Sequence, residues 1–112
     1  MWRSLGKITV TTAGTPVQVS ATRIPAQTIF FQQVEANIGK IYICSSAAAN
    51  KTTGVGVLAT IPAPTLNASL VAVVLPYAAA TTPSAPGGLS ASQFWIDADN
   101  SAEGCIVSYI SP

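Results

Sequence analysis

The sequence alternates between apolar and polar residues over most of its length, and this pattern limits what the chain can fold into. Ile8 and Val10 are separated by a single polar residue, and Ile41 and Ile43 flank Tyr42. A period of two places successive side chains on opposite faces of an extended chain, so it predicts β-strands rather than helices. We expect strands over residues 6–12, 17–20, 28–35, 40–44, 55–59, 69–75, 92–97 and 105–110. This pattern is typical of an all-β fold, and we expect an antiparallel β-sandwich of about eight strands, of jelly-roll or Greek-key type.

Glycine, proline and asparagine mark the connections between these strands. Residues 13–16 predict a tight turn, and residues 37–39 and 99–104 predict hairpin loops. The segment 69–75 is apolar on both faces, which predicts a central strand covered on both sides. Residues 76–90 contain three prolines and predict a long loop, which in a small domain is often a contact for a partner.

Charged side chains are scarce, with five lysines and arginines, four aspartates and glutamates, and no histidine in 112 residues. A typical domain has about three times this share of charged residues. Because general acid–base and nucleophilic catalysis lack their usual groups here, we expect no enzyme activity. Scattered cations provide no stripe for nucleic acid, and the longest apolar window is too short to cross a membrane. Protein interfaces are depleted in charge, so this composition favours a surface covered by neighbouring subunits.

Cys44 and Cys105 are the only cysteines, and each lies in a strand-like run. In a secreted sandwich such a pair would form a disulfide across the sheets, whereas in a protein of the cytosol both would be buried free thiols. The start of the chain lacks the apolar run of a signal peptide, which favours free thiols.

Acidic residues gather between positions 97 and 103. Asp97, Asp99 and Ser101 occupy alternate positions, and oxygen ligands in this spacing can bind calcium. The match to a calcium loop is partial, because Gly104 comes late and no bidentate acid follows it. We favour a polar turn over a calcium site and expect no cofactor.

The N-terminus supplies the first candidate contact residues. Residues 1–5 predict an arm ahead of a single sandwich domain over residues 6–112, and the arm contains Trp2 and Arg3. Tryptophan and arginine are enriched in interface hot spots. Trp2 therefore either inserts into a neighbouring subunit or docks on its own domain.

Other aromatic residues supply further candidates. Trp95 follows Phe94 in a predicted strand, so one ring could enter the core while the other faces outward, where Trp95 would fit a sugar or a subunit contact. We favour the alternative, in which both rings are buried between the sheets. The loop from Tyr77 to Leu89 is the remaining candidate contact.

Several segments together suggest a family. These segments are residues 2–10 (WRSLGKITV), 39–43 (GKIYI), 94–99 (FWIDAD), 103–104 (EG) and 107–109 (VSY). In this order they resemble small virion structural proteins of tailed bacteriophages. The resemblance implies a capsid cement or decoration protein, some of which are jelly-roll-like sandwiches that clamp neighbouring shell subunits. It further implies a place on the capsid exterior after assembly in the host cytoplasm, with the phage major capsid protein and further copies of the chain, as a dimer or trimer, as partners.

Other functions fit the same sequence. A carbohydrate- or receptor-binding module of a tail or fibre would use Trp95 and Tyr77 as sugar platforms. A head–tail or neck component would form a ring of fixed number, and a small hydrolase would show turnover. Glycan binding lost in Trp95→Ala would identify the first of these.

Overall fold

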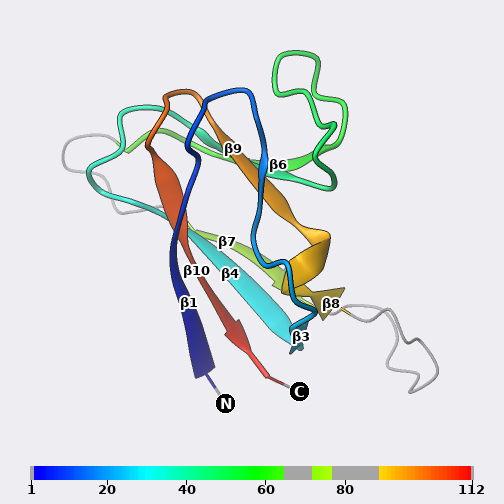
Figure 1. The fold of residues 1–112 in the computed structure, drawn as a ribbon. Coiled ribbons are helices and arrows are strands. Elements are labelled where there is room, and N and C mark those ends of the chain that lie inside the picture. Colours follow the sequence, from blue (N-terminus) through cyan, green and yellow to red (C-terminus); the bar gives the residue numbers. More distant parts are fainter. Residues whose placement is uncertain (1, 65–71, 77–88, 112) are drawn as a thin grey trace.

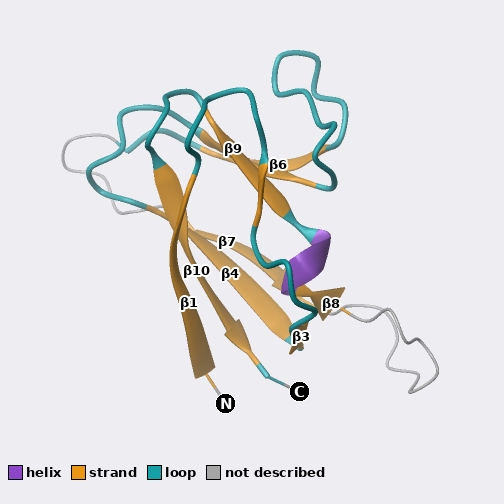
Figure 2. Cartoon of the chain, in the orientation of Figure 1, coloured by secondary structure: helices purple, strands orange, loops and turns teal. Residues whose placement is uncertain are grey.

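The computed structural model describes residues 2–64, 72–76 and 89–111, which form two four-stranded antiparallel sheets (Figure 1). The first sheet contains, in spatial order, β1 (Trp2–Thr9), β10 (Gly104–Ile110), β4 (Thr28–Gln33) and β7 (Ala72–Pro76). The second contains β2 (Val17–Gln18), β9 (Trp95–Ala98), β5 (Ile41–Cys44) and β6 (Val57–Ile61). A short ribbon pairs β3 (Pro25–Ala26) with β8 (Leu89–Ser90), and the 3-10 turn η1 (Ala91–Gln93) follows (Figure 2). The predicted all-β sandwich is confirmed, and each strand of the two sheets overlaps one of the predicted ranges.

The strands pair in a nested order around the connection between β5 and β6. β5 pairs with β6, β4 with β7, β3 with β8, β2 with β9 and β1 with β10, all antiparallel. Two further pairings, β10 with β4 and β9 with β5, join these ribbons into sheets. The second half of the chain therefore retraces the first half, and among the described strands only β5 and β6 form a hairpin between consecutive strands.

Two predicted hairpins are wrong for this reason. Residues 34–40 lead from β4 in the first sheet to β5 in the second, and residues 99–103 lead from β9 in the second sheet to β10 in the first. A tight loop that crosses between sheets has the same turn residues as a hairpin loop, so the local pattern cannot distinguish them. The predicted central strand is also misplaced, because β7 lies at an edge of the first sheet.

The core lies between the two sheets and follows the alternation of the sequence. In β4, Ile29, Phe31 and Gln33 are buried while the residues between them are half-buried. The ring of Phe31 meets that of Phe94 edge to face at 5.8 Å between centroids, a favourable aromatic geometry. Gln33 is satisfied inside the core, because its amide donates to the carbonyl of Pro62 at 2.9 Å and its oxygen accepts from the side chain of Asn37.

The predicted N-terminal arm is instead the first half of β1. Trp2 and Arg3 pair with Ile110 and Tyr109 of β10, so residues 2–5 belong to the first sheet. Hydrogen bonding to the last strand orders this segment, and a prediction from local sequence has no access to a partner more than a hundred residues away.

Two glycines shape the pairing of β1 with β10. The register shifts between Ser4 and Gly6, where Gly6 has φ +74° and donates its amide to the Ser4 hydroxyl at 3.0 Å. At the other end of the pair, a Cβ added to Gly104 would lie 1.9 Å from the carbonyl oxygen of Ile8. Glycine at position 104 thus allows the two backbones to approach closely.

Both cysteines are free and buried, as the free-thiol interpretation predicts. Cys44 lies in β5 and Cys105 in β10, which belong to different sheets. Burial, with a smaller contribution from the charge of Asp97, raises the pKa of Cys44 to about 11. Burial raises the pKa of Cys105 to about 12, so both thiols stay protonated at neutral pH.

Thiol reactivity checks this arrangement. Because the thiolate is the reacting species and both thiols are buried, neither cysteine of the folded protein should react with an aromatic disulfide reagent at about pH 8. Both should react in denaturant. Rapid reaction of a native thiol would contradict the burial of that residue.

Replacement of a single core ring tests the packing. Phe31→Ala should lower the free energy of unfolding by about 3–5 kcal/mol, because it leaves a cavity between the sheets. Phe30→Ala is the matched control on the half-buried outer side of the same strand and should cost clearly less. Denaturant unfolding of both variants measures the difference in the free energy of unfolding. An equal loss in the two variants would contradict the assignment of Phe31 to the core side and Phe30 to the outer side of β4.

Candidate interaction surface

The outer face of the first sheet carries an aromatic pair that spans the central strand β10. The rings of Trp2 in β1 and Phe30 in β4 lie 4.6 Å apart between centroids with an interplanar angle of 31°. β10 separates the two strands in the sheet, and the register pairs Trp2 with Ile110 and Phe30 with Ser108. The small Ser108 side chain leaves room for the rings to meet across the strand. Trp2 is 62% exposed, so the pair is open to a partner.

Ile106 and Ile110 of β10 add apolar side chains to the face that carries this pair. Ile106 is paired with Lys7 of β1 and Gln32 of β4, and its side chain is exposed. The face formed by Trp2, Ser4, Lys7, Phe30, Gln32, Ile106, Ser108 and Ile110 is called the β10 face below. Among these residues Lys7 carries the only charge, and exposed apolar patches of this kind mark interaction sites.

The sequence-predicted contact residues do not gather on one surface. Trp2 lies on the β10 face, and Arg3 is exposed beside it in β1. Trp95 lies in β9 of the second sheet and is half-buried, outside the core that contains Phe94, so the expected burial of both rings between the sheets is wrong for Trp95. Alternation explains the difference, because neighbouring residues of a strand face opposite sides. Tyr77 lies outside the described residues.

Leu89 and Trp2 also differ from expectation. Leu89 pairs with Ala26 in the short ribbon rather than lying in a loop. Trp2 contacts Phe30 of its own chain, which agrees with docking on its own domain, while most of its surface stays open. Phe30 was missed as a contact residue. The adjacent Phe30 and Phe31 were a usable signal, because in a strand one of the two must face outward.

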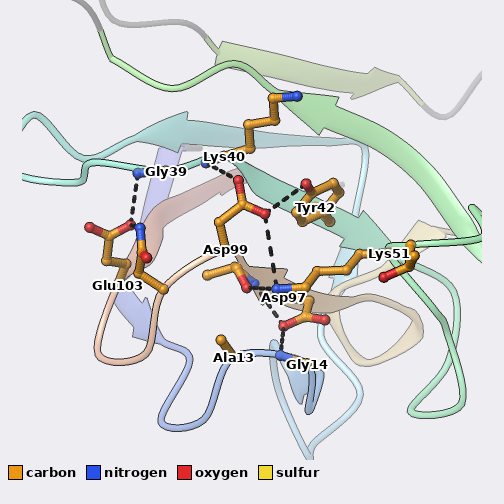
Figure 3. A network of polar contacts seen from close by, with 12 residues as sticks. Ala13, Gly14, Gly39, Lys40, Tyr42, Lys51, Asp97, Asp99 and Glu103 are labelled. Carbon is orange, nitrogen blue, oxygen red and sulfur yellow. Dashed lines mark hydrogen bonds and ion pairs between the residues drawn. The ribbon is translucent and has the colours of Figure 1, made fainter.

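Acidic side chains tie the loops together where β9 leads into β10 (Figure 3). The buried Asp97 accepts hydrogen bonds from the amides of Gly14 at 2.9 Å and Ala98 at 2.8 Å. Ser101 accepts from the amide of Ala13 at 3.0 Å. These contacts hold the turn between β1 and β2 against the segment that follows β9.

Asp99 and Glu103 hold the loop that crosses from β4 to β5. Glu103 accepts from the amides of Ile38 at 2.6 Å and Gly39 at 3.1 Å, and Asp99 accepts from the amide of Lys40 at 3.1 Å. Asp99 also accepts from the Tyr42 hydroxyl at 2.8 Å. The chain thus uses its few carboxylates to bind its own backbone amides.

A lysine completes this polar network. The Lys51 ammonium lies 3.9 Å from Asp99, donates to the carbonyl of Ala98 and lies 5.9 Å from the centre of the Tyr42 ring. Through Lys51 the loop between β5 and β6 reaches across to the segment that follows β9. The polar network thus ties three other connections, β1–β2, β4–β5 and β5–β6, to the connection between β9 and β10. Burial, together with the hydrogen bond to Asp99 and its charge, raises the pKa of Tyr42 to about 12.

The hydrogen bonds also change how the two carboxylates titrate. Partial burial alone would raise the pKa of Asp99, but the Lys40 amide, the Tyr42 hydroxyl and the nearby lysines outweigh it and lower the pKa below its ordinary value. Burial alone would also raise the pKa of Glu103. The hydrogen bonds from the amides of Ile38 and Gly39 outweigh this effect, so the pKa of Glu103 is lowered as well. The ionised forms therefore stabilise the folded state.

This geometry disfavours the calcium interpretation of Asp97, Asp99 and Ser101. Their side-chain oxygens accept hydrogen bonds from amides or a hydroxyl of this chain. Within the described ranges no three histidine, cysteine, aspartate or glutamate side chains form a group that could hold a metal ion. Sequence reasoning missed the role of Glu103, because Ile38 and Gly39 lie more than sixty positions earlier in the chain.

Comparisons with known proteins identify no relative of this chain. No family model, no curated protein and no solved structure matches this chain. In the part of the chain that the structure describes, no helix has the length and apolar character to cross a membrane.

The titration of the polar network can be measured through stability. A lowered folded-state pKa stabilises the protein above the unfolded-state pKa of about 4, and this contribution is lost as the pH falls through the lowered value. Glu103→Gln should be less stable than the parent at neutral pH and should lose less stability between about pH 6 and pH 3. Glu35→Gln is the matched control, because it removes the same charge from an exposed residue. This variant should lose as much stability at low pH as the parent does. Denaturant midpoints across this pH range provide the measurement, and an identical slope in Glu103→Gln and the parent would contradict the role of Glu103.

Proposed function

We propose that this protein is a non-enzymatic structural protein of a tailed-bacteriophage virion, which binds the capsid shell and reinforces it as a cement or decoration protein. The observation that carries the proposal is the β10 face, where the exposed Trp2 packs on Phe30 among residues of which only Lys7 is charged. Aromatic anchors in a patch depleted in charge are typical of protein interfaces. Its partners would be the major capsid protein and further copies of the chain as a dimer or trimer.

The fold supports the same proposal. Two antiparallel sheets whose strands pair in nested order favour the jelly-roll type, an architecture common among viral capsid domains. The carboxylates of the polar network are hydrogen-bonded to the chain's own backbone, which fixes loops rather than leaving acids free for catalysis. A domain whose loops are fixed in this way, and which exposes an aromatic pair, suits a protein that acts by packing.

The mechanism would rest on repetition. Each copy binds through a small apolar surface, and an oligomer that bridges adjacent shell subunits makes its second contact at a high effective concentration. Many modest contacts then sum to mechanical reinforcement of the shell. A capsid offers the same site many times, so this design needs no single strong interface.

The carbohydrate- or receptor-binding alternative relies on Trp95 rather than on the β10 face. Trp95 is half-buried in the second sheet, and a partly open tryptophan side chain can stack on a sugar. Glycan binding that Trp95→Ala abolishes and Trp2→Ala leaves intact would favour this alternative over the cement role.

Paired variants test the proposed surface. Trp2→Ala and Phe30→Ala should each lower occupancy on purified shells roughly tenfold or more, because hot-spot aromatic residues carry much of the binding free energy. Leu58→Ala is the matched control, since Leu58 is 55% exposed on β6 of the other sheet. Denaturant unfolding checks that each variant is folded. Occupancy unchanged in Trp2→Ala would remove the β10 face from the proposal.

The copy number of the chain in purified virions separates the structural roles. Quantitative mass spectrometry against the major shell protein should give hundreds of copies for a cement protein. A few dozen copies would instead indicate a neck or fibre component. Absence from particles would refute the virion role.

A further inference from the structure

The strand β1 presents a free edge. It is the outermost strand of the first sheet, next to β10 on one side only, and most of its residues are exposed (Figure 1). An edge strand exposes backbone amides and carbonyls that can pair with another chain. Among the described residues, no strand pairs with the other side of β1.

The hydrogen-bond pattern identifies which amides point outward. Val10 donates to the carbonyl of Glu103 at 2.8 Å, and its own carbonyl accepts from Ala102 at 2.8 Å. In an antiparallel pair, the residues bonded to the partner alternate with residues whose amides face away. Lys7 and Thr9 alternate along β1 with the residues that are bonded to β10, with which Val10 is in phase. Their amides and carbonyls therefore point away from β10 toward solvent.

The charge of the edge is all of one sign. Arg3 and Lys7 are exposed cations on β1, and the strand contains no carboxylate. Within the described residues neither cation forms an ion pair, and the one ion pair joins Lys51 to Asp99. An edge that is cationic and open along its backbone fits an extended partner segment that carries carboxylates.

A second copy of β1 fits this edge poorly. An antiparallel pair of two β1 strands would bring Arg3 and Lys7 of both copies into one ribbon without any carboxylate to balance them. Like charges close together across a strand pair are destabilising. The edge therefore favours a different chain with acidic residues.

We propose that β1 is a docking edge that accepts an extended, carboxylate-bearing peptide segment of a partner protein as an added β-strand. This inference rests on the proposed function only for the identity of the partner, which would then be a shell subunit. Backbone pairing would centre on Lys7 and Thr9, because the bulge between Ser4 and Gly6 interrupts the regular edge. Affinity would come from main-chain hydrogen bonds and selectivity from Arg3 and Lys7.

Two synthetic peptides test the proposal on the full chain. One is a blocked eight-residue peptide of alternating valine and glutamate, and the matched control has lysine in place of glutamate. Amide NMR should show that the glutamate peptide shifts the Lys7 and Thr9 amides and slows their hydrogen exchange, whereas the lysine peptide does neither. The glutamate peptide should bind at least about tenfold more weakly in Lys7→Glu, while Arg23→Glu, an equal charge change outside β1, should bind it normally.

Two further variants sharpen the result. Arg3→Glu combined with Lys7→Glu should reverse the preference toward the lysine peptide, and this gain of binding also demonstrates that the variant folds. Thr9→Pro removes one outward amide and should abolish protection at the edge, with its fold checked by denaturant unfolding.

Four outcomes would overturn the proposal. These are equal binding of both peptides, equal loss of binding in Lys7→Glu and Arg23→Glu, amide shifts confined to β4 and β10 with none in β1, and self-association through β1 without peptide. The copy number in virions tests the proposed function separately. If the protein binds the glutamate peptide but is absent from virions, the proposal for β1 stands and the cement role is rejected.

Discussion

The hydrogen bonding of β10 on both of its sides is the interaction on which the first sheet depends. β10 pairs with β1 along one edge and with β4 along the other, so it joins the N-terminal strand to the middle of the chain. Its inward residues, Cys105, Val107 and Tyr109, belong to the core. Its outward residues lie beneath the ring contact of Trp2 with Phe30, so the same strand that closes the core also supports the proposed contact face.

A second constraint acts where β9 leads into β10. Asp97, Asp99 and Glu103 come from one short segment, yet they accept hydrogen bonds from the loop after β1 and from the loop after β4. A chain with so few carboxylates has placed most of them where they fix backbone rather than where they solvate the surface.

Much of the fold was predictable because the alternation of apolar and polar residues is a local signal. The runs around Ile41 and Ile29 predicted strands that the structure contains, and Cys44 and Cys105 are free and buried as predicted. The sheet to which each strand belongs could not be predicted, since residues 37–39 carry the same turn signals whether the chain reverses within one sheet or crosses to the other. The candidate site was harder to predict from the sequence. Trp2 contacts Phe30, and Glu103 accepts a hydrogen bond from Ile38, but the residues of each pair lie far apart in the sequence and meet only in the folded chain.

The nested pairing also determines when the fold can form during synthesis of the chain. Contacts between the first and last strands join residues from opposite ends of the chain. Such topologies fold slowly, because distant segments must close large loops before they gain contacts. During synthesis β1 has no neighbour in its sheet until residues 104–110 have left the ribosome. Trp2 likewise has no strand to lie across until that moment. A truncated or unfinished chain would therefore lack the β10 face, so the order of translation would keep incomplete chains from presenting the proposed contact.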